Sequence, residues 1–141
     1  PETGVVTVDR YTVVDDFGNL INPMLAEGQV HGGVVQGIGQ AIQEHVVYDE
    51  DGQLLTASFM DYAIPRAADV PFVSFNSEPV PSTANLMGMK GCGEAGTVGA
   101  LAAVSNAVQD ALWERGVRQA DMPFTPHKVW ALLNDSAIAA E

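Results

Sequence analysis

Apolar and polar positions along the chain predict two separate strands and a hairpin. Val5–Val14 is rich in β-branched residues, which favour a strand, and turn-forming residues follow it in Asp15–Asn19. Phe72–Phe75 predicts a second short strand. Val46–Leu55 predicts a β-hairpin, because an Asp-Gly pair separates two apolar segments there.

Three other segments have the spacing of helices. Met24–Val47 carries apolar residues every four or five positions, at Leu25, Val30, Val34, Ile38, Ile42 and Val46. Thr97–Glu114 is rich in alanine, and its apolar face is formed by Leu101, Val104, Val108 and Leu112. Arg115 and Gly116 are suited to end that helix. A last helix begins at Thr125 as N-cap and Pro126 as first helical residue, with Phe124 and Val129 placed as a hydrophobic staple.

Between the strand and the second helix, Ser77–Gly96 shows little periodic pattern and predicts a long loop. Long loops inside compact domains are usually functional or disordered. The pattern as a whole predicts an α+β fold, with one domain over residues 1–141.

Glycines are unusually frequent inside the first predicted helix. Each costs about 1 kcal/mol relative to alanine in a helix interior. Two explanations are open: another element packs very close to the bare backbone, or a ligand touches it. The residues concerned are Gly28, Gly32, Gly33, Gly37 and Gly39.

Composition excludes several classes of partner. The chain is 47% hydrophobic and carries 18 acidic against six basic residues, for a formal charge of −12. The basic residues are scattered, so neither nucleic acid nor an anionic membrane surface is an expected partner. Cys92 is the single cysteine, no apolar run is long enough to span a bilayer, and no secretory leader is visible. We expect a cytoplasmic protein, or a periplasmic one if a signal lies upstream of Pro1, which itself suggests a fragment.

The segment 91–96 (GCGEAG) satisfies the G-x-G-x-x-G pattern, but it does not predict a dinucleotide fold. The residues before it do not form a strand pattern, and Asp110 downstream falls inside a helix. What remains is a glycine-rich loop that leads into a helix N-terminus, a general arrangement for binding anions. Two shorter motifs, Asp16-Phe17-Gly18 and Asp49-x-Asp51-Gly52, are interpreted as turns.

Glu94 has two interpretations. An acidic residue at a helix start is often stabilised only by the helix dipole. Its neighbouring glycines, however, leave the carboxylate accessible to a small ligand, and Lys90 could pair with it. Cys92 has no histidine nearby in the sequence to act as a base, so we expect a small buried residue. His31 lacks a suitably spaced second ligand, so no metal site is expected from the protein side chains.

Four segments in order resemble the large subunits of molybdenum hydroxylases, the family of xanthine dehydrogenase, aldehyde oxidase and carbon monoxide dehydrogenase. The segment 28–41 (GQVHGGVVQGIGQA) is similar to the family's G-Q-x-x-G-x-x-x-Q-G-(I/L)-G pattern, and 61–65 to D-Y-x-x-P. The segment 90–96 resembles K-G-x-G-E, and 106–111 resembles N-A-V-x-D-A. The resemblance covers nearly the whole chain and implies the family's C-terminal molybdopterin-binding segment.

The resemblance implies roles for particular residues. Glu94 falls where the family has its catalytic glutamate beside molybdenum, and Gln29 falls where the family binds the phosphate region of the cofactor. We expect both to face one cavity, and we expect cofactor contact to explain the helical glycines better than helix packing does. The implied cofactor-binding residues are Gln29, His31, Gly32, Gly33, Gln36, Lys90, Gly91, Cys92 and Gly93.

The implied function is that of a fragment of a hydroxylase that oxidises an aldehyde or N-heterocycle with water as the oxygen source. The implied cofactor is molybdopterin with molybdenum, expected as the cytosine dinucleotide, and the isolated chain is expected to hold none. Implied partners are the remainder of the large subunit, iron–sulfur and FAD subunits or domains, and a small-molecule substrate. The alternatives are a non-catalytic anion- or nucleotide-binding domain and a domain kept for subunit contacts.

Overall fold

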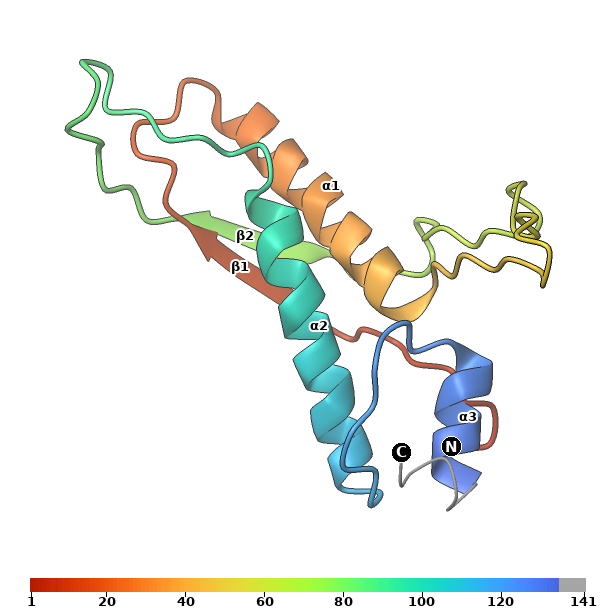
Figure 1. Ribbon diagram of the computed structural model, residues 1–141. Helices are drawn as coiled ribbons and strands as arrows, with labels where there is room; N and C mark the ends of the chain where they lie inside the picture. Colours follow the sequence, from red (N-terminus) through yellow and green to blue (C-terminus); the bar gives the residue numbers. More distant parts are fainter. Residues whose placement is uncertain (135–141) are drawn as a thin grey trace.

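The structure is a computed structural model that describes residues 1–134. It contains the expected mixture of helices and strands, whereas residues 135–141 of the predicted domain lie outside the described part. Figure 1 shows the elements in order along the chain: β1 (Tyr11–Asp15), α1 (Pro23–Ile42), β2 (Val73–Ser77), α2 (Ala95–Trp113) and α3 (Pro126–Asn134).

The two strands pair in parallel, and α1 lies in the connection between them. The register pairs Tyr11 with Val73 and Asp15 with Ser77, so β1, α1 and β2 form one β-α-β unit. The prediction of a strand over Val5–Val14 is wrong for residues 5–10, which have no strand partner. β2 is only five residues long, and a β-branched segment becomes a strand only where a neighbouring backbone accepts its hydrogen bonds.

Helix α1 begins at a well-formed cap and ends earlier than predicted. The Oδ1 of Asn22 accepts a hydrogen bond from the N–H of Leu25 at 3.1 Å, and Pro23 occupies the first turn. The helix ends at Ile42, where the N–H groups of residues 43 and 44 both bond to the Gly39 carbonyl. The apolar face is buried from Val30 to Ile42, but its predicted outer members Leu25 and Val46 are 65% and 50% exposed.

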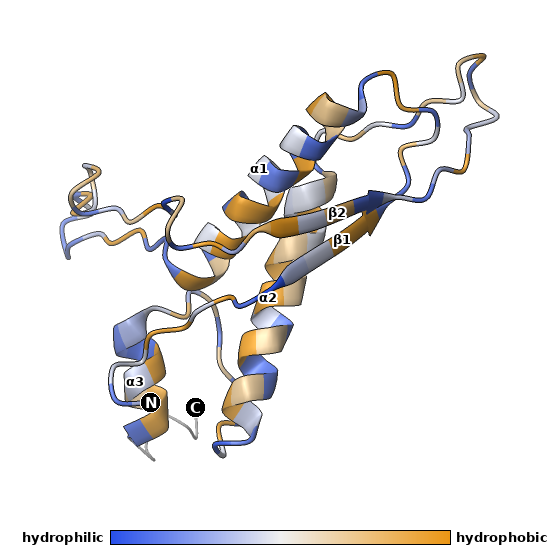
Figure 2. Ribbon diagram, turned by 180° about the vertical axis from the view of Figure 1, so that it is seen from behind, coloured by the Kyte–Doolittle hydropathy of each residue, from blue (hydrophilic) through white to orange (hydrophobic). Residues whose placement is uncertain are grey.

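The segment that connects α1 to β2, residues 43–72, projects away from the helices as an arm (Figures 1 and 2). It contains the predicted hairpin, because Tyr48 and Leu54 form an antiparallel bridge and Gly52 adopts φ +80° in the turn. Asp49 accepts hydrogen bonds from the N–H groups of Asp51 and Gln53, which closes the turn.

Helices α1 and α2 pack against each other through glycines. A Cβ added to Gly33 would lie 2.8 Å from the backbone nitrogen of Thr97, and one added to Gly96 would lie 2.4 Å from the Val30 carbonyl oxygen. Gly37 faces Ala100 in the same way, because a Cβ added to Gly37 would lie 2.5 Å from the Cβ of Ala100. Close helix packing is therefore a sufficient reason for these glycines. The expectation that cofactor contact explains the helical glycines better is wrong for Gly33 and Gly37.

The chain after α2 follows the predicted pattern closely. Gly116 has φ +92° just beyond the helix, a conformation that favours glycine. The N–H of Lys128 donates to Thr125 Oγ1 at 3.4 Å, as expected of an N-cap. Phe124 and Val129 are both buried, in agreement with the hydrophobic staple. In the part of the chain that the structure describes, no helix is long and apolar enough to cross a membrane.

Candidate functional site

The two glycine-rich segments meet where the first half of α1 lies against the start of α2. Gln29 Nε2 donates a hydrogen bond to the Gly93 carbonyl oxygen at 2.7 Å. Thr97 Oγ1 lies 3.2 Å from the Gly33 carbonyl oxygen and 3.3 Å from Gln36 Oε1. The predicted approach of these segments is therefore confirmed. Sequence reasoning missed Thr97, since nothing near it in the sequence indicates a contact with residues more than 60 positions away.

The glycines of this region fall into two groups. Gly33 and Gly96 are buried in the contact between the helices. A Cβ on Gly28, Gly32, Gly91 or Gly93 would meet no atom within 4 Å. The second group therefore presents bare backbone to open space, and packing within residues 1–134 does not explain it.

A shallow cavity of about 400 Å³ lies beside Gln29. It is lined on one side by Phe17, residues 19–22, Leu25 and Ala26, and on the other by Met89, Lys90, Cys92 and Gly93. Glu94 is not among the residues that line it, so Gln29 and Glu94 do not share this cavity, although their segments touch. Cys92 is half-buried against the core rather than fully buried.

Glu94 is the N-cap residue of α2, but its side chain does not cap the helix. The carboxylate accepts no hydrogen bond from the first turn, and only the backbone carbonyl of Glu94 is used, by the N–H of Val98 at 3.0 Å. The side chain is exposed. The free N–H groups of the first turn carry the positive end of the helix dipole, so both a carboxylate and an anion-binding helix end are presented at one place.

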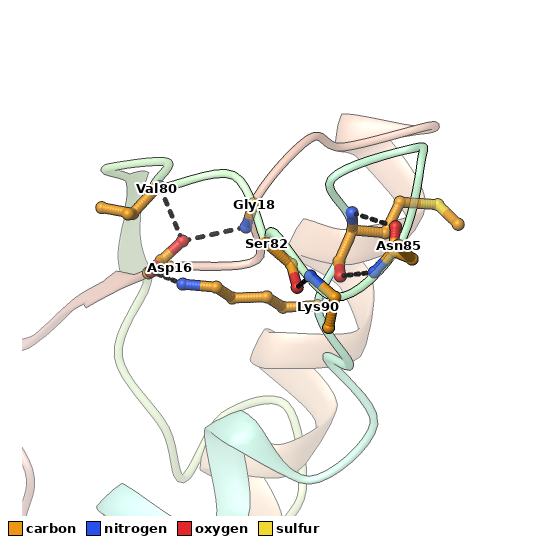
Figure 3. A network of polar contacts seen from close by, with 8 residues as sticks. Asp16, Gly18, Val80, Ser82, Asn85 and Lys90 are labelled. Atoms are coloured by element: carbon orange, nitrogen blue, oxygen red, sulfur yellow. Dashed lines mark hydrogen bonds and ion pairs between the residues drawn. The ribbon is translucent and has the colours of Figure 1, made fainter.

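Lys90 is paired with Asp16 and not with Glu94. Its Nζ contacts Asp16 Oδ2, while Asp16 Oδ1 accepts from the N–H groups of Gly18 at 2.9 Å and Val80 at 2.8 Å (Figure 3). The hydrogen bond from Lys90, followed by the two backbone donors, lowers the pKa of Asp16 from 3.8 to about 2. Asp16 was predicted as part of a turn, which is confirmed, but its distant partners carry no local sequence signal.

We expect the pKa values of Asp16 and its neighbour Asp15 to depart in opposite directions from the ordinary value of an aspartate. The pKa of Asp15 is raised above 3.8 by burial, whereas that of Asp16 is lowered to about 2. Because the folded pKa of Asp16 lies below its unfolded value, its stabilising effect is complete above about pH 4 and is lost as the pH falls through about 2. An NMR titration of the two carboxyl carbons checks this, and a midpoint for Asp16 at or above that of Asp15 contradicts it.

The other predicted site residues lie on the same stretch of α1. His31 packs edge-on against Phe72, with ring centroids 6.0 Å apart, and its Nε2 is 3.7 Å from Glu27 Oε1. Gln36 is exposed beside Thr97. Within residues 1–134, no three His, Cys, Asp or Glu side chains are grouped so that they could hold a metal ion.

The Asp61-Tyr62-x-x-Pro65 motif lies at the opposite end of α1. The hydroxyl of Tyr62 donates to Glu44 Oε2 at 2.5 Å, and the ring of Pro65 lies against Gly39. The hydrogen bond to Glu44, with smaller effects of burial and charge, raises the pKa of Tyr62. This motif therefore anchors the arm to α1 and contributes no side chain near Gln29.

Known proteins match both the sequence and this arrangement of elements. Residues 1–71 match the family model of the molybdopterin cofactor-binding domain. The nicotine 6-hydroxylase large subunit of Paenarthrobacter nicotinovorans is 45% identical over 129 residues, which is 92% of this chain and 16% of that protein. The carbon monoxide dehydrogenase large chain of Hydrogenophaga pseudoflava is 37% identical over 97% of this chain and 17% of its own length.

Solved structures give the same result. Quinoline 2-oxidoreductase from Pseudomonas putida 86 superposes with a TM-score of 0.90 at 41% identity, over 94% of this chain and 17% of that one. A carbon monoxide dehydrogenase from Oligotropha carboxidovorans gives 0.88 at 38% identity, over 93% of this chain and 16% of that one.

The chain belongs to the molybdopterin cofactor-binding domain family and corresponds to a segment of a molybdenum hydroxylase large subunit. It spans about a sixth of the length of these relatives. The family model ends at residue 71, before the loop that carries Glu94.

Proposed function

We propose that this chain is the part of a molybdenum hydroxylase that presents the catalytic base Glu94 and binds the molybdopterin cofactor with the glycine-rich segments of α1 and residues 90–93. The observation that carries the proposal is the hydrogen bond from Gln29 to the Gly93 carbonyl at 2.7 Å. It joins the two segments that the resemblance assigns to one cofactor, although 64 residues separate them in the chain.

The residues present fit such a cofactor in their chemistry. Gly28, Gly32, Gly91 and Gly93 leave their backbone open, so a flat or bulky group can approach the N–H and carbonyl groups closely. The uncapped first turn of α2 offers N–H donors to a phosphate. Gln29 also retains its side-chain carbonyl oxygen as an acceptor, since the contact with Gly93 uses the amide nitrogen.

Glu94 is suited to accept a proton. When bound, the molybdenum cofactor supplies the two-electron oxidation of a substrate carbon, with oxygen drawn from water. The carboxylate of Glu94 then accepts the proton of the attacking oxygen nucleophile. Lys90 forms its ion pair with Asp16, so in the described residues it forms none with Glu94. A base that works near neutral pH gains from a dry surrounding, which bound cofactor and neighbouring polypeptide would provide.

Of the two substrate classes that the resemblance implies, the relatives favour an N-heterocycle over an aldehyde. The nicotine 6-hydroxylase large subunit and quinoline 2-oxidoreductase match at 45% and 41% identity. The aldehyde oxidoreductase from Desulfovibrio gigas matches at 32%. Anaerobic reduction of the complete enzyme by a pyridine, a quinoline and an aldehyde tests this order.

Exposed apolar side chains support the proposal that other parts of the same enzyme contact this chain. Large apolar side chains stand exposed on the arm, at Phe59 (84%) and Met60 (93%), and on the loop before Glu94, at Leu86 (108%). Apolar side chains that stand exposed next to one another, as Phe59 and Met60 do, are suited to be covered by another polypeptide. We propose that the remainder of the large subunit covers them and that iron–sulfur and FAD subunits or domains carry the electrons away. The same surface is compatible with the alternative of a subunit-contact domain, which predicts no role for Glu94.

We predict that the purified 141-residue chain contains no molybdenum, whereas the complete large subunit with its partners contains it in stoichiometric amount. The reason is that the open glycine backbone within residues 1–134 forms only one side of the proposed cofactor site. The same residues contain no group of side chains that could hold a metal ion. Elemental analysis of both preparations checks the prediction, and analysis of the released nucleotide tests the cytosine dinucleotide form. Stoichiometric molybdopterin in the isolated chain would contradict it.

A further inference from the structure

The loop that leads to Glu94 has no helix or strand of its own and is held by the turn after β1. Within residues 78–94, Met89 forms an antiparallel bridge with Gly18. The backbone N–H of Lys90 donates to the Phe17 carbonyl at 2.9 Å. Asn19 donates to the loop twice, from its backbone to Gly88 at 3.0 Å and from its side chain to Met87 at 2.8 Å.

Asp16 is the side chain that contacts both ends of this loop. Its Oδ1 accepts from Val80 N–H near the beginning of the loop, and its Oδ2 contacts Lys90 Nζ near the end (Figure 3). It also accepts from Gly18 N–H, which fixes its own turn. These three partners occupy most of the roughly four acceptor sites of a carboxylate, and charge-assisted hydrogen bonds are about twice as strong as neutral ones.

The short stretch before Glu94 is therefore anchored twice. Lys90 is bound to Asp16, and the Gly93 carbonyl is bound to Gln29 on α1. Glu94 follows Gly93 directly and begins α2, whose first turn is packed on α1 at Gly96. The anchor on α1 comes from Gln29, which is already assigned to the cofactor, whereas the anchor in the turn after β1 comes from Asp16, which has no assigned role.

We infer that Asp16 is a positioning residue for Glu94: through Lys90 and Val80 it holds the loop that sets where the Glu94 carboxylate stands. This inference rests on the proposed function. It differs from a role in stability alone, because it predicts a loss in the rate of substrate oxidation per bound molybdenum.

The test compares three variants of the complete enzyme. Asp16→Ala removes all three contacts of the carboxylate. Asp16→Asn keeps an oxygen for Gly18 and Val80 but removes the charge that binds Lys90, so it remains informative if the alanine variant loses its cofactor. Asp49→Ala is the matched control, because Asp49 also accepts two backbone hydrogen bonds in a turn, at 3.0 and 2.8 Å, but in the arm.

Two quantities are measured: amide hydrogen exchange of residues 78–94, and the limiting rate of anaerobic reduction by substrate per molybdenum. We expect faster exchange of the loop in both Asp16 variants, with exchange of α1 unchanged. A displacement of 1 Å can cost about 10²-fold in rate, and since Gln29 still holds Gly93 we expect a smaller loss of about tenfold for Asp16→Ala. Asp16→Asn should lie between this variant and the wild type, and Asp49→Ala should match the wild type in both measurements.

Wild-type reduction rates in the Asp16 variants, together with faster exchange, would overturn the inference and leave Asp16 a structural residue. Unchanged exchange would overturn it as well, because the loop would then not depend on Asp16. The proposed function fails separately: it is contradicted if Glu94→Gln reduces at the wild-type rate, whatever the Asp16 variants do.

Discussion

Glu94→Gln in the complete enzyme should lower the rate of anaerobic reduction by substrate by at least about 10²-fold, with molybdenum content unchanged. General-base catalysis typically contributes 10²–10⁴-fold, and glutamine keeps the size of the side chain but cannot accept the proton. The effect on folding should be small, because the Glu94 side chain makes no capping hydrogen bond to α2. Stopped-flow reduction, with a thermal melt of the same sample, gives both values.

A matched control stands at the other end of the same helix. Glu114 is the exposed C-cap residue of α2, so Glu114→Gln makes the same chemical change far from the glycine-rich segments. It should leave the reduction rate unchanged and leave stability unchanged or slightly higher, because a negative charge at a helix C-terminus is unfavourable by about 0.3–1 kcal/mol. A purely electrostatic role for Glu94 predicts only a loss of stability of that size. Near wild-type reduction by Glu94→Gln would therefore end the catalytic assignment.

Two adjacent glycines of α1 should respond to alanine with opposite signs. Gly33→Ala places a Cβ 2.8 Å from the Thr97 nitrogen and 3.0 Å from Gly96 Cα, so the two helices must separate. Overpacking of this kind costs about 1–3 kcal/mol, and the better helix propensity of alanine returns only about 0.5–1 kcal/mol. The Cβ that Gly32→Ala adds would lie within 4 Å of no other atom. This variant should therefore gain about 0.5–1 kcal/mol of helix propensity without a cost in packing.

Urea unfolding of the two variants and the parent chain measures this difference directly. In the complete enzyme, Gly32→Ala is expected to lower the molybdenum content although it does not lower the stability. The reason is that the added methyl group occupies the open backbone proposed to face molybdopterin. If Gly32→Ala retains full molybdenum content, Gly32 does not approach the cofactor. A stabilising Gly33→Ala would show that the α1–α2 contact can relax, contrary to the geometry.

Local patterns in the sequence predicted the helices well and the strands less well. Apolar spacing from Val30 to Ile42 and from Val104 to Leu112 identified the buried faces of α1 and α2, because a helix forms its hydrogen bonds within one segment. Residues 5–10, of which four are β-branched, carry the same kind of signal as 11–15, yet only the latter pair with β2. Strand formation depends on a partner elsewhere in the chain, which local composition does not contain.

The sequence by itself determined the family, the turn at Asp16–Gly18, and the order of the segments proposed to contact the cofactor, because these depend on residue types at fixed local spacings. The tertiary structure decided three further matters: that Gly33 faces Gly96 while Gly32 faces open space, that Gln29 reaches Gly93, and that Lys90 binds Asp16 instead of Glu94. Each of these contacts joins residues more than 60 positions apart. These contacts form only when α1 packs on α2 and the loop folds back on the turn after β1. They therefore depend on distances in the folded chain, which local spacing in the sequence does not contain.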